Sequence, residues 1–217
     1  MKLLAYQEQA KRTMPTLGIC NSPLGIYDQT FHDNRSEHYK DSRWEASDIL
    51  NSLHMTVGMN TEIGETVLCL KMSNTIDKVN LQEEIGDILW YFANYATVHD
   101  IDLSKYDFLY QGFYFEEEYK KYPNLRVYDL VLLHASDLLD YDKKQLAYRK
   151  SKDRLKVEKS FESLFQALAD MFLTYGLDPY RAMQNNIDKL RVRYPEKFTT
   201  EHAINRDLDK ERVELEK

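Results

Sequence analysis

The sequence predicts an all-α protein folded as a helical bundle. Only 7 of the 217 residues are Gly and 5 are Pro, so the strongest helix breakers are scarce. Hydrophobic residues make up 43% of the chain and charged residues 30%, which is the balance of a globular protein with a sizeable core. Apolar side chains recur at steps of three and four over long stretches, which is the period of an amphipathic helix.

The charge balance, the lack of a long apolar run and the cysteine pattern argue against a nucleic-acid-binding, membrane-spanning or disulfide-rich protein. With 36 acidic and 29 basic residues the net charge is −7, so the chain offers no general attraction to nucleic acid or to an anionic membrane. No apolar run approaches the roughly 20 residues of a membrane span. Cys20 and Cys69 have neither metal-ligand spacing nor the pattern of a disulfide framework, which favours a cytoplasmic location.

The first half of the chain predicts two helices separated by a loop. Residues 3–13 form a short amphipathic pattern that ends before Pro15. Residues 14–40 have the composition of a loop, and residues 42–72 carry a long apolar stripe. Glu62 and Glu65 lie beside this stripe, so we expect both carboxylates to be at least half buried.

A third helix is expected to begin at Asn80, with Glu83 completing a capping box. Glu84 and Asp87 form its polar strip, and a short connection at residues 73–79 makes it antiparallel to the preceding helix. The two acidic strips should therefore face each other. Glycine inside a helix costs about 1 kcal/mol relative to alanine, so Gly64 and Gly86 indicate close helix approach or ligand access.

Residues 104–178 predict an insertion. Its first part, 104–128, is rich in aromatic residues and should lie over the core, whereas base stacking there is disfavoured by the acids within it. Its second part predicts another helical hairpin, which is either a degenerate copy of the first or a chance similarity. In that copy Glu62, Glu65, Glu84 and Asp87 align with Asp142, Gln145, Ser160 and Ser163.

The closing segment, residues 179–217, should complete one domain with the catalytic helices of residues 1–103. Asp178 followed by Pro179 is a strong helix start, and this helix should end at Arg193, before Pro195. Thr200 is expected to cap a last, solvated helix over residues 201–217.

The chemistry is predicted by two similar tetrapeptides, Glu62-Ile63-Gly64-Glu65 and Glu84-Ile85-Gly86-Asp87. An i, i+3 pair lies on one helical face about 5–6 Å apart, so each tetrapeptide presents two carboxylates to one point. Oxygen ligands of this kind suit Mg²⁺, with Mn²⁺ as a substitute. We therefore predict metal-assisted hydrolysis of a phosphate compound, with Lys189 and Arg193 stabilising charge on the leaving group.

Other interpretations of the same acids remain open at this point. A di-iron carboxylate bundle needs a Glu-x-x-His motif, which the chain lacks. The acids could instead be solvated helix positions in a non-catalytic dimerisation or regulatory protein. A hydrolase for another phosphorylated metabolite is a further alternative.

The acidic motifs resemble those of the MazG-like all-α nucleoside triphosphate pyrophosphohydrolases. The terminal helices agree with this, since residues 6–13 are similar to the family's opening helix and residues 186–198 to its closing one. The resemblance covers roughly residues 3–102 and 179–212, and the insertion between them departs from compact members. The acidic motifs that carry the resemblance lie in the segments from His54 to Glu65 and from Leu81 to Phe92.

The resemblance implies hydrolysis of an NTP or dNTP between the α and β phosphates, giving a nucleoside monophosphate and pyrophosphate. It implies Mg²⁺ bound by Glu62, Glu65, Glu84 and Asp87. It also implies contacts of Tyr91, Asn186 and Lys189 with the nucleotide or its phosphates. A homo-oligomer, most simply a dimer, is expected, although the insertion could fill the place of a second subunit within one chain.

Overall fold

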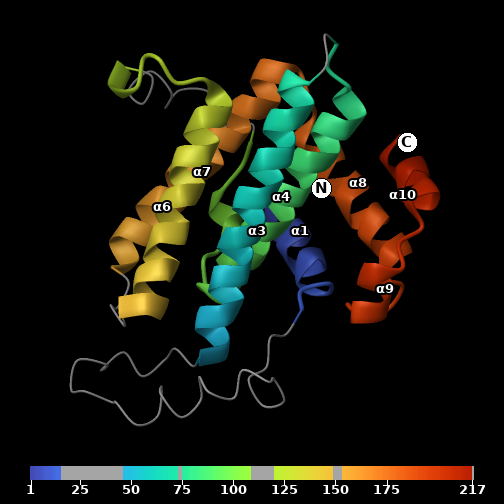
Figure 1. Cartoon of the computed structure of the whole chain (residues 1–217), viewed down its shortest axis with the longest axis horizontal. Coiled ribbons are helices and arrows are strands. Elements are labelled where there is room, and N and C mark those ends of the chain that lie inside the picture. Colours follow the sequence, from blue (N-terminus) through green and yellow to red (C-terminus); the bar gives the residue numbers. More distant parts are fainter. Residues whose placement is uncertain (16–45, 73–74, 109–119, 149–152, 217) are drawn as a thin grey trace.

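The computed structural model describes residues 1–15, 46–72, 75–108, 120–148 and 153–216. Within these ranges the chain forms eight α-helices and one short 3₁₀ helix, and no strand. The all-α prediction is therefore confirmed for the described residues (Figure 1). The helices are α1 (Leu3–Lys11), α3 (Ala46–Lys71), α4 (Lys78–Val98), α6 (Val127–Tyr148), α7 (Arg154–Tyr175), α8 (Pro179–Arg193), α9 (Thr200–Ile204) and α10 (Leu208–Leu215), with η1 at Leu103–Lys105.

The long helices α3 and α4 form the centre of the molecule. They pack along each other, and the hairpin of α6 and α7 lies against α3 on one side. On the other side α1 and α8 cover α4, and α10 packs on α8 (Figure 1). In the described part of the chain no helix is both long and apolar enough to cross a membrane.

A continuous core of buried side chains joins these helices. Phe92 of α4 stacks on Phe161 of α7 with ring centroids 4.0 Å apart, so the inserted hairpin shares its core with the central pair. Tyr106 and Phe108 pack against Phe165, as expected for aromatic residues that cover the core. The remaining aromatic residues at 109–119, the predicted loop at 14–40 from residue 16 onward, and Cys20 lie outside the described residues.

The predicted start of α4 is wrong by one helical turn. Its N-cap is Asp77, whose carboxylate accepts hydrogen bonds from the backbone N–H groups of Val79 (3.0 Å) and Asn80 (3.2 Å). Asn80 therefore lies inside the helix, and Glu83 does not complete a capping box. Glu83 instead contacts Lys189 of α8.

The predicted terminal helix is also wrong, because the structure divides it into two. Thr199, not Thr200, caps α9, which ends at Ile204. Asp207 then caps α10 by accepting a hydrogen bond from the Lys210 N–H at 3.2 Å. By contrast the start of α8 is confirmed, since Asp178 caps it and Pro179 is its first residue.

A buried carboxylate attaches α6 to α3. Asp142 has no exposed surface and accepts hydrogen bonds from Ser52 Oγ and Thr56 Oγ1, both at 2.7 Å. In the predicted repeat Asp142 aligns with Glu62. In this structure it is a cross-link between helices, because hydroxyl groups supply the donors that a buried carboxylate needs.

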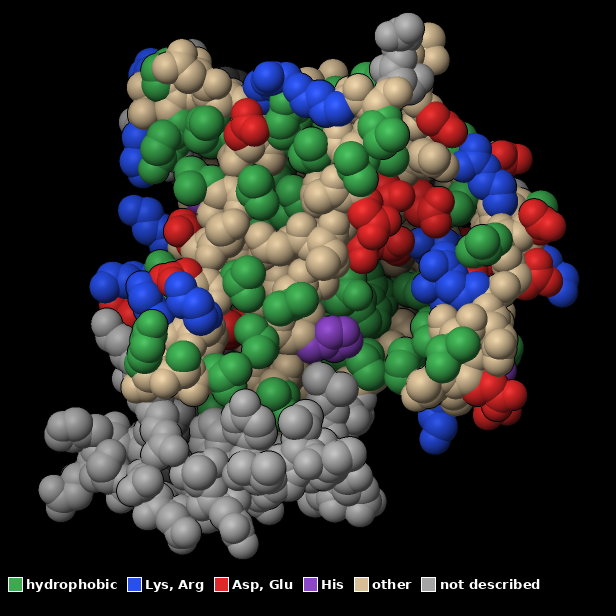
Figure 2. All heavy atoms as spheres, viewed as in Figure 1, with side chains coloured by type: hydrophobic (Ala, Val, Ile, Leu, Met, Phe, Trp, Pro, Cys, Tyr) green, Lys and Arg blue, Asp and Glu red, His purple; other side chains and the backbone are tan. Residues whose placement is uncertain are grey.

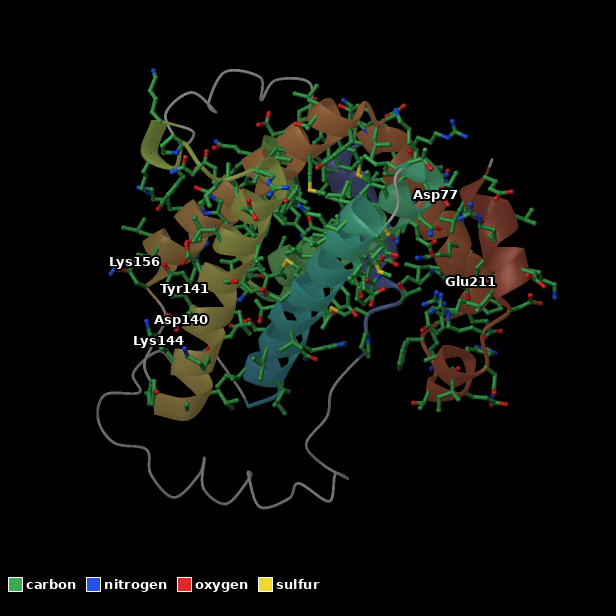
Figure 3. All side chains as sticks on the ribbon, turned by 45° about the horizontal axis from the view of Figure 1, so that its top comes forward. Asp77, Asp140, Tyr141, Lys144, Lys156 and Glu211 are labelled. Atoms are coloured by element: carbon green, nitrogen blue, oxygen red, sulfur yellow. The ribbon has the colours of Figure 1, made fainter. Side chains whose placement is uncertain are left out.

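Replacing Asp142 by Ala should lower the free energy of unfolding by about 2–4 kcal/mol, because it removes two buried hydrogen bonds to a carboxylate. Asp140→Ala is the matched control. Asp140 lies beside Lys144 on α6 (Figure 3). It pairs with Lys143 and Lys144 in solvent, so its loss should cost less than about 1 kcal/mol. Urea titration of both variants gives the comparison, and equal losses would contradict the cross-link.

Candidate functional site

Three acidic side chains of the central helix pair converge. Glu62 on α3 and Glu84 and Asp87 on α4 each offer a carboxylate oxygen, and these oxygens lie within 4.8 Å of one another. The expectation that the two acidic strips face each other is confirmed for these three residues. Glu65 is exposed on α3 and is not a member of this group, so its role as a metal ligand stays a prediction.

Burial and neighbouring charges raise the affinity of Glu62 and Glu84 for protons. Burial raises the pKa of Glu62 to about 8, with further contributions from the charges of Asp87, Glu65 and Glu84. The pKa of Glu84 rises to about 7, again through burial and then through Asp87 and Glu65. Ionising Glu62 and Glu84 together with Asp87 is therefore unfavourable in this half-buried position, and a bound cation would offset that cost.

A fully buried lysine on α8 forms an ion pair with Asp87. Lys189 of α8 has no exposed side-chain surface, and its ammonium donates to both oxygens of Asp87 at 2.7 and 2.6 Å. It also contacts Glu83 Oε1 at 3.3 Å. Burial alone would lower the pKa of Lys189, but the charges of Asp87 and Glu83 outweigh it and raise the pKa. Lys189 is therefore a charged partner of the acids.

Asn186 and Tyr6 extend this contact to the first helix. Asn186 Nδ2 donates to Asp87 Oδ1 at 2.6 Å, and its Oδ1 accepts a hydrogen bond from the Tyr6 hydroxyl at 2.8 Å. The tyrosine thereby sets which way the amide faces. Sequence reasoning missed Tyr6, which is buried on α1, since only its place in an apolar stripe was visible.

The glycines of the site have different roles. A Cβ atom at Gly86 would lie 3.3 Å from Asn186 Cβ and 3.4 Å from the Ala182 carbonyl oxygen, so close approach of α4 and α8 is confirmed there. Gly64 has nothing within 4 Å of such an atom. Gly58, one turn before Glu62, is the tightest case, because a Cβ would lie 2.1 Å from Tyr91 Cε1. The Tyr91 ring therefore rests on the bare backbone of α3.

A pocket of about 190 Å³ opens beside the acids. Glu62 and Asp87 form its acidic wall, and Arg193 and Tyr91 also line it. Burial raises the pKa of Tyr91 to about 12, helped by the charges of Glu62 and Asp87, so its hydroxyl stays protonated. Other rings that line the pocket belong to His54, Trp90, Tyr194 and Phe198.

The predicted substrate contacts thus divide into two groups. Tyr91 and Arg193 line the pocket, whereas Asn186 and Lys189 are buried behind Asp87. Figure 2 shows acidic side chains gathered directly beside basic ones, on the side of the molecule where α8 and α10 lie. An oxygen-only ligand set beside such a pocket suits a hard cation such as Mg²⁺ or Mn²⁺ and does not suit Zn²⁺, which prefers His and Cys.

Comparisons of this chain with known protein families, with curated proteins and with solved structures found no match.

The acid cluster predicts a stability that depends on pH and metal. Glu62 and Glu84 have pKa values raised above 4.5, the usual value for a glutamate, so they favour the folded state most at low pH. Without divalent cations their contribution should be lost as the pH rises from about 4.5 through about 8. Mg²⁺ should restore it, with a larger rise in Tm at pH 8 than at pH 6.

The control for this prediction is Glu62→Gln, which keeps the shape of the side chain and removes its charge. In metal-free buffer at pH 8 this variant should melt at least about 2–4 °C above the natural protein, the shift that 1 kcal/mol produces in a chain of this size. Its response to Mg²⁺ should be much reduced. Scanning calorimetry at both pH values checks this, and an unchanged Mg²⁺ response in the variant would contradict a metal site at Glu62.

Proposed function

We propose that the protein is a Mg²⁺-dependent hydrolase that cleaves an NTP or dNTP between the α and β phosphates. The observation that carries the proposal is the group formed by Glu62, Glu84 and Asp87, whose oxygens lie within 4.8 Å of one another. Two of these residues, Glu62 and Asp87, line the adjacent pocket. Three converging, charge-strained carboxylates are unfavourable for a merely structural helix pair, and a substrate that arrives with a divalent cation resolves the excess charge.

The residues of the pocket support a phosphorylated, ring-containing ligand. Glu62, Glu84 and Asp87 would hold the metal. Mg²⁺ when bound neutralises phosphate charge and lowers the pKa of a coordinated water. Arg193 offers a guanidinium group to phosphate oxygens. The aromatic rings beside it provide faces on which a nucleobase can stack.

Lys189 and Asn186 support the reaction indirectly. Both donate to Asp87, so they hold this carboxylate in one orientation toward the acid cluster. An orientation fixed before the substrate binds reduces the reorganisation that the reaction requires. The choice of the α–β bond rests on the resemblance of the acidic motifs to the MazG-like pyrophosphohydrolases. Dimerisation and a cytoplasmic location remain predictions.

A second candidate is a hydrolase for a smaller phosphorylated metabolite. The pocket volume of about 190 Å³ favours this alternative, because pockets for drug-sized ligands usually measure about 300–1,000 Å³. For a nucleotide the same volume implies that only the base and part of the sugar enter the pocket. The phosphates would then lie over the acids.

The decisive experiment incubates the protein with Mg²⁺ and a panel of canonical and modified NTPs and dNTPs, together with small phosphate esters. Monophosphate and pyrophosphate should appear in equal amounts. Glu62→Gln should lower kcat/KM at least ~100-fold, because losing a metal ligand removes several kcal/mol of transition-state stabilisation. Glu162→Gln, an exposed acid on α7, should retain full activity.

Each other outcome has a distinct meaning. Turnover of esters alone would favour the small-metabolite hydrolase, and orthophosphate as the direct product would indicate a different bond. A natural protein that turns over nothing and binds no Mg²⁺ in a calorimetric titration would be a non-catalytic helical protein. Full activity of Glu62→Gln would exclude the acid cluster as the catalytic site.

A further inference from the structure

We propose that Glu211 is a positioning residue, which holds the guanidinium group of Arg193 in the pocket as a binding site for the outer phosphates of the substrate. This inference rests on the proposed function, since it names the group that would receive the pyrophosphate leaving group. It also gives the C-terminal helix α10 a role in the site.

Arg193 is the cation best placed to meet a phosphate. Among the described residues that line the pocket it is the one with a permanent positive charge, and it faces the same space as Glu62 and Asp87. The neighbouring cation, Lys189, has no exposed side-chain surface and is already bonded to Asp87 and Glu83. A phosphate that bridges the metal ligands and a protein cation would therefore reach Arg193 first.

Glu211 fixes one edge of this guanidinium group. Its oxygens accept hydrogen bonds from Arg193 Nε at 2.9 Å and Nη2 at 2.5 Å, and its side chain is only 3% exposed. Two parallel bonds of this kind define the plane of the guanidinium group. The hydrogen bonds of Arg193 within the described part of the chain use Nε and Nη2, so Nη1 is left for a ligand.

A second arginine keeps the cluster positive. Arg206 Nη2 donates to Glu211 Oε2 at 2.7 Å, so one carboxylate is shared between two guanidinium groups. Burial alone would raise the pKa of Glu211, but hydrogen bonds from Arg193 and Arg206 lower it to about 2. Glu211 is then ionised at neutral pH, and the three groups together carry one net positive charge, which favours an anion.

The attachment of α10 does not depend on Glu211 alone. Arg212 Nη1 donates to Asn80 Oδ1 at 2.6 Å, and the same side chain lies 3.6 Å from Asp77 at the start of α4. Asn185 Nδ2 donates to the Leu215 carbonyl oxygen at 2.9 Å. Figure 3 shows Glu211 between α10 and α8, with Asp77 nearby at the beginning of α4. Arg212 therefore offers a matched control that loosens α10 without touching Arg193.

The experiment compares Glu211→Gln with Arg212→Ala. Without the carboxylate, Arg193 should turn toward Glu62 and Asp87 and lose its orientation for phosphate. Titration calorimetry with inorganic pyrophosphate and Mg²⁺ should show binding about tenfold weaker for Glu211→Gln, and within about twofold of the natural protein for Arg212→Ala. In turnover assays Glu211→Gln should raise KM more than it lowers kcat.

The outcomes separate this inference from the proposed function. If the natural protein binds pyrophosphate through Arg193 and Glu211 but hydrolyses no nucleotide, the proposed function fails and the positioning role stands. Equal loss of pyrophosphate binding in both variants would mean that α10 acts only by docking, and would overturn the inference. Unchanged or tighter binding by Glu211→Gln, or no binding by the natural protein, would overturn it as well.

Discussion

The buried ion pair between Lys189 and Asp87 is the interaction on which the site depends. It joins α8 to α4 with both carboxylate oxygens occupied at 2.6 and 2.7 Å, and the ammonium group has no access to solvent. Removing two charges from water costs free energy, and only good geometry and further hydrogen bonds offset this cost. Asn186 supplies such a bond, and the bare backbone at Gly86 lets α8 come close enough to form it.

The acids around this ion pair reduce the stability of the fold. Glu62 and Glu84 are held near Asp87 although burial and mutual repulsion raise their pKa values. A helix pair selected for stability alone would carry apolar or oppositely charged residues at these positions. The cost of ionising these acids together is the strongest physical argument for the proposed cation, and the cluster lies beside a pocket with aromatic walls.

Much of the fold could be predicted because it follows from local pattern. The apolar period of α3 and α4 placed Glu62, Glu84 and Asp87 on facing strips, and the Asp178-Pro179 pair marked the start of α8. The start of α4 could not be decided in this way, since Asp77 and Asn80 are both good caps and only the folded chain shows which one is used. The contacts of Tyr6 and Glu211 could not be predicted for a different reason, because tertiary packing decides which residues they meet.

The hydrogen bond between Tyr6 and Asn186 joins α1 to α8 beside the acid cluster. The Tyr6 hydroxyl and Asn186 Oδ1 are 180 positions apart in sequence, and Asp87 is oriented through them. Closing so long a loop costs chain entropy that local helix formation does not repay, so contacts of this separation form late in folding. The central helices can therefore assemble before the acid cluster acquires its final orientation. Partly folded chains would then contain the acids without an ordered cluster.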